Sequence, residues 1–175
     1  RSPAPSGPHS HHHTSFEEFS LRDWQKTLDV NLTGVFITCQ VFGSAMAKNG
    51  RGTIINIPSL YALVAPDHRI YPAGPDGAPQ YKPVAYSVSK AGVRALTQYL
   101  AVYWGKAGVR VNNLIPHGVM RAPDANFSER FCQKNPMQRR PKVEEVVSAM
   151  LFLASDASSY MTGADLVVDG GWSVW

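Results

Sequence analysis

The sequence contains few cysteines and no long uninterrupted apolar run. Its 175 residues include two cysteines, Cys39 and Cys132, which form no Cys-x-x-Cys pair, so a disulfide framework and a zinc ribbon are both unsupported and a cytoplasmic location is favoured. Apolar stretches such as residues 35–39 are far shorter than the roughly 18 residues that cross a bilayer. We therefore expect no contact with a membrane.

The sequence also lacks a concentration of charge of one sign. There are 17 basic and 13 acidic residues, which give a formal net charge of +4. The one basic cluster, residues 139–142, is smaller than the basic, aromatic-studded face that nucleic-acid binding requires. We expect this cluster to be a solvated turn before a helix, and we expect no nucleic-acid partner.

Residues 1–15 are rich in Pro, Ser, Gly and His and show no hydrophobic period, which is typical of a disordered or tag-like leader. They include no apolar segment of the kind found in a signal peptide. Their histidines have no fixed geometry, so we predict no metal site. Residues 16–175 are expected to form a single domain, since 44% of the chain is apolar and that length can bury a core.

Helical and strand patterns alternate along this domain. Short β-branched runs bounded by glycine or proline predict strands at 53–57, 109–115 and 165–168. Longer amphipathic stretches predict helices at 21–30, 32–48, 85–106, 127–133 and 143–154, and a proline-rich loop is expected at 61–84. Alternation of this kind predicts an α/β fold in which helices cover a parallel sheet in three layers.

The most informative pair is Tyr86 and Lys90, at the start of the helix expected at 85–106. Residues four apart lie on one helical face, so the two side chains are within reach of each other. An ammonium beside a phenol favours the phenolate form, which makes the pair a candidate for acid/base chemistry. Taken alone, this spacing usually indicates a packed tyrosine beside a solvated lysine.

Further polar residues are expected near this pair. Ser59 follows the first strand, and Pro116-His117-Gly118-Val119 follows the second. Residues beyond the carboxyl ends of parallel strands face the ligand crevice of such sheets. Asn31 is predicted to lie between the two leading helices.

From about residue 16 to 175 the chain resembles the C-terminal two-thirds of a classical short-chain dehydrogenase/reductase. The resemblance rests on motifs in a fixed order: Asn31-Leu32-Thr33-Gly34, the strand that ends at Ser59, Tyr86-x-x-x-Lys90, Pro116-x-Gly118 and Val168-Asp169-Gly170-Gly171. It implies a doubly wound parallel sheet of the Rossmann type, here without its N-terminal strands. It also implies an NAD(P)-dependent oxidoreductase that interconverts a secondary alcohol and a ketone.

The resemblance also implies a role for each matching residue. Tyr86 would exchange a proton with the substrate oxygen, and Ser59 would hydrogen-bond the same oxygen. Lys90 would favour the Tyr86 phenolate and, with Tyr86, contact the NAD or NADP cofactor. Asn31 would position a water in the proton relay. The nicotinamide would be bordered by Pro116, His117, Gly118 and Val119.

Two departures from the family pattern bear on activity. The glycine-rich turn that follows the first strand of the family has no counterpart, because Gly50 and Gly52 precede a strand. We therefore expect weak or absent cofactor binding by this chain, and an alternative reading is a truncated, catalytically impaired remnant that acts at most as a binding or assembly module. His117 stands where the family usually has glycine; it would either crowd the nicotinamide or lie at the rim, and the exposure habits of histidine favour the rim.

The interval between Ser59 and Tyr86 is 27 positions, roughly twice the usual family spacing. The additional residues 66–71 include a carboxylate, a cation and an aromatic ring, which would suit a polar, sugar-like substrate or, equally, a surface or oligomer contact. In the family, helices that correspond to residues 32–48 and 85–106 pair across a dimer interface, so a homo-oligomer is expected.

Overall fold

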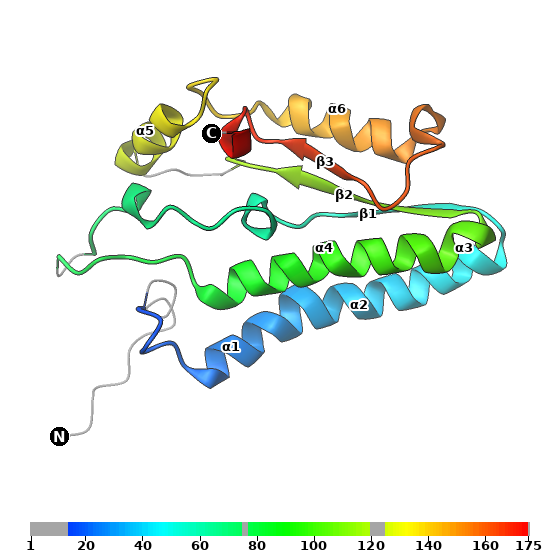
Figure 1. Cartoon of the computed structure of the whole chain (residues 1–175), viewed down its shortest axis with the longest axis horizontal. Helices are drawn as coiled ribbons and strands as arrows, with labels where there is room; N and C mark the ends of the chain where they lie inside the picture. Colours follow the sequence, from blue (N-terminus) through cyan, green and yellow to red (C-terminus); the bar gives the residue numbers. More distant parts are fainter. Residues whose placement is uncertain (1–13, 75–76, 120–124, 175) are drawn as a thin grey trace.

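The computed structural model describes residues 14–74, 77–119 and 125–174, so nearly all of the predicted leader lies outside the described residues. The described residues form helices and parallel strands in alternation (Figure 1). The strands are β1 Gly52–Asn56, β2 Val109–Pro116 and β3 Asp165–Val168. The helices are α1 Leu21–Leu28, α2 Gly34–Thr38, α3 Ser44–Lys48, α4 Val84–Trp104, α5 Ala125–Lys134 and α6 Val143–Ala154.

The first three helices form one continuous helix, Leu21–Lys48, so the predicted break near residue 31 is wrong. Two π-helical segments, Asp29–Thr33 and Cys39–Gly43, join α1 to α2 and α2 to α3. The backbone stays helical through Gly34, whose φ is −60°, and the side chain of Asn31 donates to another helix instead of capping this one. At Asn31 and Gly34 the helix therefore changes between α and π geometry but does not end.

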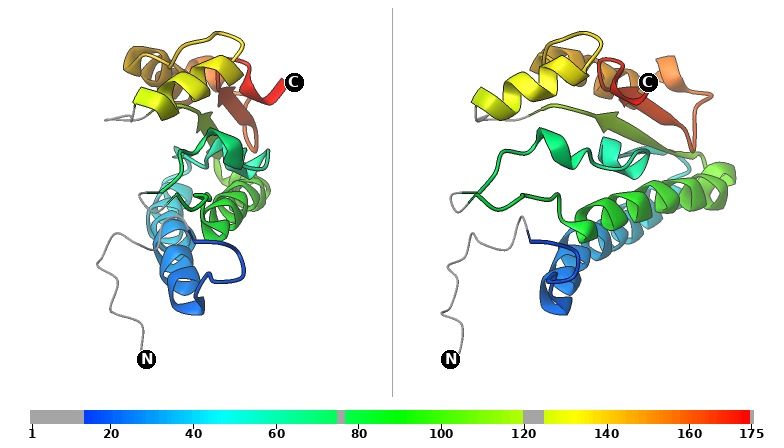
Figure 2. Two further views of the ribbon diagram at one scale, coloured as in Figure 1. Left: turned by 90° about the vertical axis from the view of Figure 1, so that its left-hand side faces the viewer. Right: turned by 60° about the vertical axis from the view of Figure 1, so that its left-hand side comes forward.

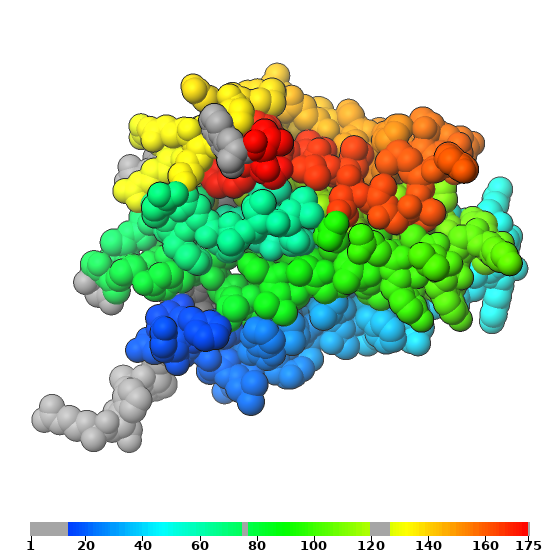
Figure 3. All heavy atoms as spheres, viewed as in Figure 1, coloured from blue at the N-terminus to red at the C-terminus, as the bar shows by residue number. Residues whose placement is uncertain are grey.

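This long helix lies along α4, as Figures 1 and 2 show from different sides and Figure 3 shows with all atoms in the view of Figure 1. The two helices approach closely where one of them has a glycine: a Cβ at Gly92 would lie 2.9 Å from the side chain of Leu32. By length and composition alone, this helix could cross a membrane, and 11% of its most apolar stretch is buried. The helix packs against α4 in the fold, and apolar side chains elsewhere on its surface are exposed, among them Phe36, Ile37 and Val41.

The sheet has the order β1-β2-β3, and both pairings are parallel. Alternate residues of β2 face opposite helical layers: Val111 packs in a core cluster with Trp104 of α4, whereas Arg110 donates to the carbonyl oxygen of Leu153 in α6. The predicted three-layer α/β arrangement is thus confirmed. Each successive strand lies on the same side of the one before it, but the helix that leads to β2 and the helices that lead to β3 cover opposite faces of the sheet. One of the two crossover connections is therefore left-handed, against the usual preference.

A buried polar row crosses the sheet beneath α4. Asn56, Asn113 and Asp165 occupy matching register positions on β1, β2 and β3. Thr97 of α4 accepts from the Asn56 amide at 2.8 Å and donates to Asn113 at 2.7 Å, and the Asn113 amide donates to Asp165 at 2.8 Å. Each of these buried polar groups therefore has a partner, which fixes the register of the strands below α4.

Strand β1 is an edge of the sheet, since it pairs with β2 on one side and with no other described strand. A groove of about 600 Å³ runs between this edge and the long helix and is lined by apolar residues that include Val35, Phe42 and Ile55. Among the described residues, β1 therefore presents an unpaired edge beside an apolar groove, which is a surface that can pair with another chain.

Candidate active site

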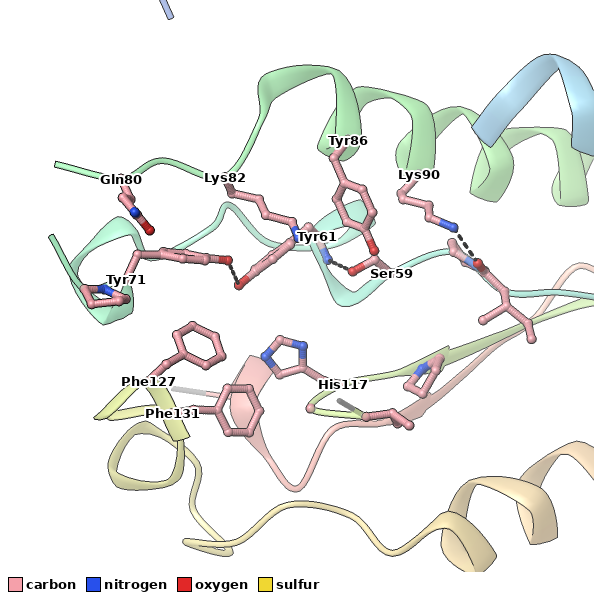
Figure 4. Close-up of a pocket in the computed structure, with 16 residues that line it drawn as sticks. Ser59, Tyr61, Tyr71, Gln80, Lys82, Tyr86, Lys90, His117, Phe127 and Phe131 are labelled. Carbon is pink, nitrogen blue, oxygen red and sulfur yellow. Dashed lines mark hydrogen bonds between the residues drawn. The ribbon is translucent and has the colours of Figure 1, made fainter. Parts of the chain in front are cut away.

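A pocket of about 550 Å³ lies beyond the carboxyl ends of β1 and β2, as expected for a parallel α/β sheet. Figure 4 shows that its walls come from the 57–61 turn, residues 71, 72, 80 and 82 of the long loop, the start of α4, residues 116–119 and α5. Its lining residues are Ile57, Pro58, Ser59, Tyr61, Tyr71, Pro72, Gln80, Lys82, Tyr86, Lys90, Pro116, His117, Gly118, Val119, Phe127 and Phe131.

Ser59 and Tyr86 reach the pocket from two different elements, the turn after β1 and the start of α4. Ser59 caps a 3₁₀ turn, and its hydroxyl accepts from the Tyr61 backbone N–H at 3.3 Å. The buried stripe of α4 begins at Ala85 and Ser89, which places Tyr86 at the edge of the buried face, in the first turn. In Figure 4 the Tyr86 and Ser59 hydroxyls point toward the same part of the pocket, which suits two groups that share one substrate oxygen.

Lys90 follows Tyr86 by one helical turn and lines the same pocket. Its ammonium donates to the carbonyl oxygen of Ile57 at 3.1 Å and lies 5.8 Å from the centre of the Tyr86 ring. Burial lowers the pKa of Lys90. The structure thus brings together three of the four predicted catalytic residues: Ser59, Tyr86 and Lys90.

Asn31, the fourth predicted catalytic residue, does not line the pocket. Its amide donates to the Ser89 hydroxyl at 3.3 Å, and that hydroxyl donates to the Tyr86 carbonyl oxygen at 2.8 Å. Asn31 therefore contacts α4 between the tyrosine and the lysine, from behind the pocket wall. Asn31 belongs to a π-helical segment, and such irregular helical turns are often found at functional sites.

Residues 116–119 form the opposite rim and floor of the pocket. Pro116 ends β2, and His117 extends the pairing by donating its backbone N–H to Val168 at 3.0 Å. Gly118 has a φ of +79°, and a Cβ there would lie 2.6 Å from the Phe131 ring, so glycine is required by both conformation and space. Val119 is half exposed beside the opening.

His117 is buried, so the expected rim position is wrong. It is 9% exposed, and its ring packs against Tyr61, Phe131 and Trp172 at centroid distances of 5.7, 4.8 and 4.7 Å. These aromatic neighbours exclude water from the imidazole. Burial lowers the pKa of His117 to about 4, with Arg140 and Lys82 adding to the effect and Asp169 opposing it. The ring is therefore neutral at physiological pH, and its Nε2 has no hydrogen-bond partner among the described residues.

The long loop contributes Tyr71, the aromatic ring noted within residues 66–71, and further pocket residues that sequence reasoning did not single out. Tyr61 and Tyr71 share a 3.3 Å hydroxyl contact, and burial raises the pKa of both; Gln80 and Lys82 line the same wall. The charged residues of 66–71, for which a substrate contact and a surface contact were left equally open, do not line this pocket: Asp67 pairs with Arg69 and Lys134 outside it. Lys82 precedes α4, so the helical spacing that pointed to Tyr86 and Lys90 gave no signal for it.

Comparisons with known proteins identify the family of the chain. The family model described as "Enoyl-(Acyl carrier protein) reductase" matches residues 6–173, nearly the whole chain. The chain belongs to the short-chain dehydrogenase/reductase family. It is 39% identical over 163 residues to D-threitol dehydrogenase of Mycolicibacterium smegmatis, covering 90% of this chain and 57% of that protein. It is 40% identical over 166 residues to galactitol 2-dehydrogenase of Rhizobium johnstonii, covering 91% and 60% respectively.

Solved structures of the family have the same fold. A short-chain dehydrogenase from Leptospira borgpetersenii with bound NAD⁺ superposes with a TM-score of 0.83 at 31% identity, over 92% of this chain and 60% of that one. A gluconate 5-dehydrogenase from Burkholderia cenocepacia in complex with NADP and tartrate superposes with a TM-score of 0.79 at 32% identity, over 94% and 62%. The chain thus spans about 60% of the length of these relatives.

The residues present fit one end of the NAD(P) cofactor that the family binds. Lys90 can donate to a ribose hydroxyl, and residues 116–119 provide a turn against which a nicotinamide can lie. The pyrophosphate end has no matching cradle in the described residues: Gly50-Arg51-Gly52 leads into β1, whereas a phosphate site needs a glycine turn that opens a helix. The fit is therefore to the nicotinamide end alone.

Proposed function

We propose that the pocket is the reacting end of an NAD(P)-dependent oxidoreductase site that interconverts a secondary alcohol and a ketone. The observation that carries the proposal is the convergence of Ser59, Tyr86 and Lys90 on one pocket at the carboxyl ends of β1 and β2. Tyr86 exchanges a proton with the substrate oxygen, while Ser59 donates a hydrogen bond to that oxygen. Lys90 supplies positive charge beside the phenol, and Asn31 acts from behind α4.

The nicotinamide supplies the hydride acceptor or donor when it is bound. Lys90 and residues 116–119 are the groups that would hold it beside the substrate. The substrate is a small polar alcohol or ketone of the sugar class, in line with the polyol dehydrogenases among the relatives. Aromatic walls formed by Tyr61, Tyr71 and Phe127 give a sugar ring or chain flat apolar faces to pack against.

A second candidate function is a binding or assembly module without appreciable turnover. The exposed edge of β1 and the apolar groove beside it favour this alternative, because such an edge can pair with another chain. We propose a homo-oligomer and a cytoplasmic location for either function; the two cysteines are free thiols, as expected in a reducing compartment.

Calorimetric titration with NAD⁺ and NADP⁺ tests the cofactor site. We expect a dissociation constant well above the micromolar range. Contacts with the remote pyrophosphate supply much of the binding energy that holds the nicotinamide in position, and no described residues provide them. Lys90→Met should weaken binding further, whereas Lys106→Met, an exposed lysine outside the pocket, should not. Complete absence of Lys90-dependent binding would favour the non-catalytic alternative, and micromolar affinity would contradict the expected weak binding.

A further inference from the structure

Lys82 is a cation in the pocket without a counterion among the described residues. Its ammonium lies 4.2 Å from the centre of the Tyr86 ring and 6.0 Å from that of Tyr61. It makes no hydrogen bond or ion pair with a described residue, and burial lowers the pKa of Lys82. Lys90, by contrast, uses its ammonium to donate to Ile57. The two lysines of the pocket are therefore not equivalent.

No described residue that lines the pocket is acidic. The carboxylate of Asp67 is engaged by Arg69 and Lys134, and that of Asp169 accepts from Ser173 and from the backbone of Gly171. A partly desolvated ammonium that lacks an anionic partner carries an energetic cost, and a ligand that brings a carboxylate offsets that cost. The electrostatics of the pocket thus favour an anion.

We propose that Lys82 binds a carboxylate of the substrate, and that the preferred substrates are short polyhydroxy acids of the aldonate class. This inference rests on the proposed function, which places the reacting hydroxyl at Tyr86. Figure 4 shows Lys82 on the loop side of the Tyr86 ring and Lys90 on the other side. Because Lys82 lies so close to that ring, the carboxylate it binds is separated from the reacting carbon by a short carbon chain.

Other polar groups on the loop side suit the hydroxyls of such a chain. Nε2 of His117 is buried and lacks a partner among the described residues, and it can donate or accept according to its tautomer. The Tyr61 and Tyr71 hydroxyls stand together on the same wall. A volume of about 550 Å³ accommodates a six-carbon acid. These groups distinguish a polyhydroxy acid from a simple carboxylic acid.

The contact of Lys82 with the Tyr86 ring suggests a competing role. A cation over a tyrosine ring can act on the phenol itself, in which case Lys82 would aid proton transfer for every substrate. The two roles differ in their dependence on the ligand. Carboxylate binding makes Lys82 matter for acids and little for neutral polyols of the same length, whereas an effect on Tyr86 makes it matter equally for both.

The test compares D-gluconate with galactitol, a six-carbon acid with a neutral six-carbon polyol. Binding to the whole chain, without cofactor, is measured by calorimetry or by ligand-detected NMR. We expect gluconate to bind about tenfold or more tighter than galactitol, the effect of one charge-assisted contact. Lys82→Met should remove the preference, Lys82→Arg should retain part of it, and Lys106→Met should leave it unchanged.

Equal affinity for the two ligands, or a preference for gluconate that survives Lys82→Met, would overturn the proposal. A Lys82→Met variant that lowers turnover of gluconate and galactitol by the same factor would assign Lys82 to Tyr86 and overturn it as well. The measurement also separates this inference from the proposed function. Lys82-dependent gluconate binding without Tyr86-dependent turnover would contradict the proposed function and leave the carboxylate site standing.

Discussion

The imidazole of His117 stands edge-on to the indole of Trp172, with ring centroids 4.7 Å apart and an interplanar angle of 65°. Phe131 and Tyr61 also pack against the imidazole. Together these rings exclude water from it and favour its neutral form. The residue that replaces the usual glycine of the family is therefore part of an aromatic cluster that joins β2, α5 and the C-terminal 3₁₀ turn.

The pH dependence of stability should report this burial. Because the pKa of His117 is lowered to about 4, the unfolded chain binds a proton between pH 6.5 and 4 that the folded chain does not, so stability falls as pH falls through that interval. The full effect is about 3 kcal/mol. His117→Phe keeps an aromatic ring but cannot take up a proton. The free energy of unfolding, measured with urea, should therefore differ less between pH 7 and pH 4.5 in this variant than in the wild type. An unchanged pH dependence would show that His117 does not contribute.

Gly118→Ala should destabilise the fold at the floor of the pocket. The residue has a φ of +79°, and the added methyl would lie 2.6 Å from the Phe131 ring. We expect a loss of about 1–3 kcal/mol in the free energy of unfolding. Gly105→Ala is the matched control, because Gly105 has a φ of −54° and open space around it. Equal losses in both variants would refute the steric argument.

Thr97→Val should weaken the polar row beneath α4. The variant keeps the shape of the side chain, but it removes the hydroxyl that pairs with the side-chain N–H of Asn56 and with the side-chain oxygen Oδ1 of Asn113. Each unsatisfied group costs about 1–3 kcal/mol, so the melting temperature should fall by several degrees. Thr38→Val removes a comparable hydroxyl that is exposed on the long helix, and it should change little. A Thr97 variant as stable as this control would mean that the row carries no net stability.

The outer side of α4 should mediate self-association. Tyr99, Val102 and Tyr103 are 66%, 87% and 66% exposed, an unusual density of apolar surface on one helix. We expect a dimer in analytical ultracentrifugation, and we expect Val102→Glu combined with Tyr103→Glu to dissociate it. Gln133→Glu adds charge at an exposed polar position of α5, outside this surface, and should leave the dimer intact. A wild-type monomer at high concentration would contradict the expectation.

Much of the fold followed from local patterns. Buried β-branched runs gave the three strands to within one residue at each end, and the bounds of α6 were predicted correctly. The one clear error was the break near Asn31. Cap residues and glycines mark helix ends only when the chain turns there, and here contacts with α4, at Ser89 and Gly92, keep the backbone helical.

The candidate site was predictable where strand ends and helix spacing fix positions, as for Ser59, Tyr86 and Lys90. It was not predictable where tertiary packing decides. Burial of His117 depends on Trp172 and Phe131, which arrive from segments far along the chain. Sequence patterns give no direction for side chains in a long loop, so the inward orientation of residues such as Lys82 required the structure.

The most direct test of the account is the rate of NAD(P)H-dependent ketone reduction at millimolar cofactor, compared between the wild type and Tyr86→Phe. We predict slow turnover in the wild type, because the cofactor is weakly held and imperfectly positioned. Tyr86→Phe should reduce turnover to the uncatalysed background while circular dichroism and melting temperature stay unchanged. Tyr103→Phe, a surface tyrosine of the same helix, should retain the wild-type rate. Equal rates in the wild type and Tyr86→Phe would contradict the assignment of Tyr86 as the proton-transferring residue.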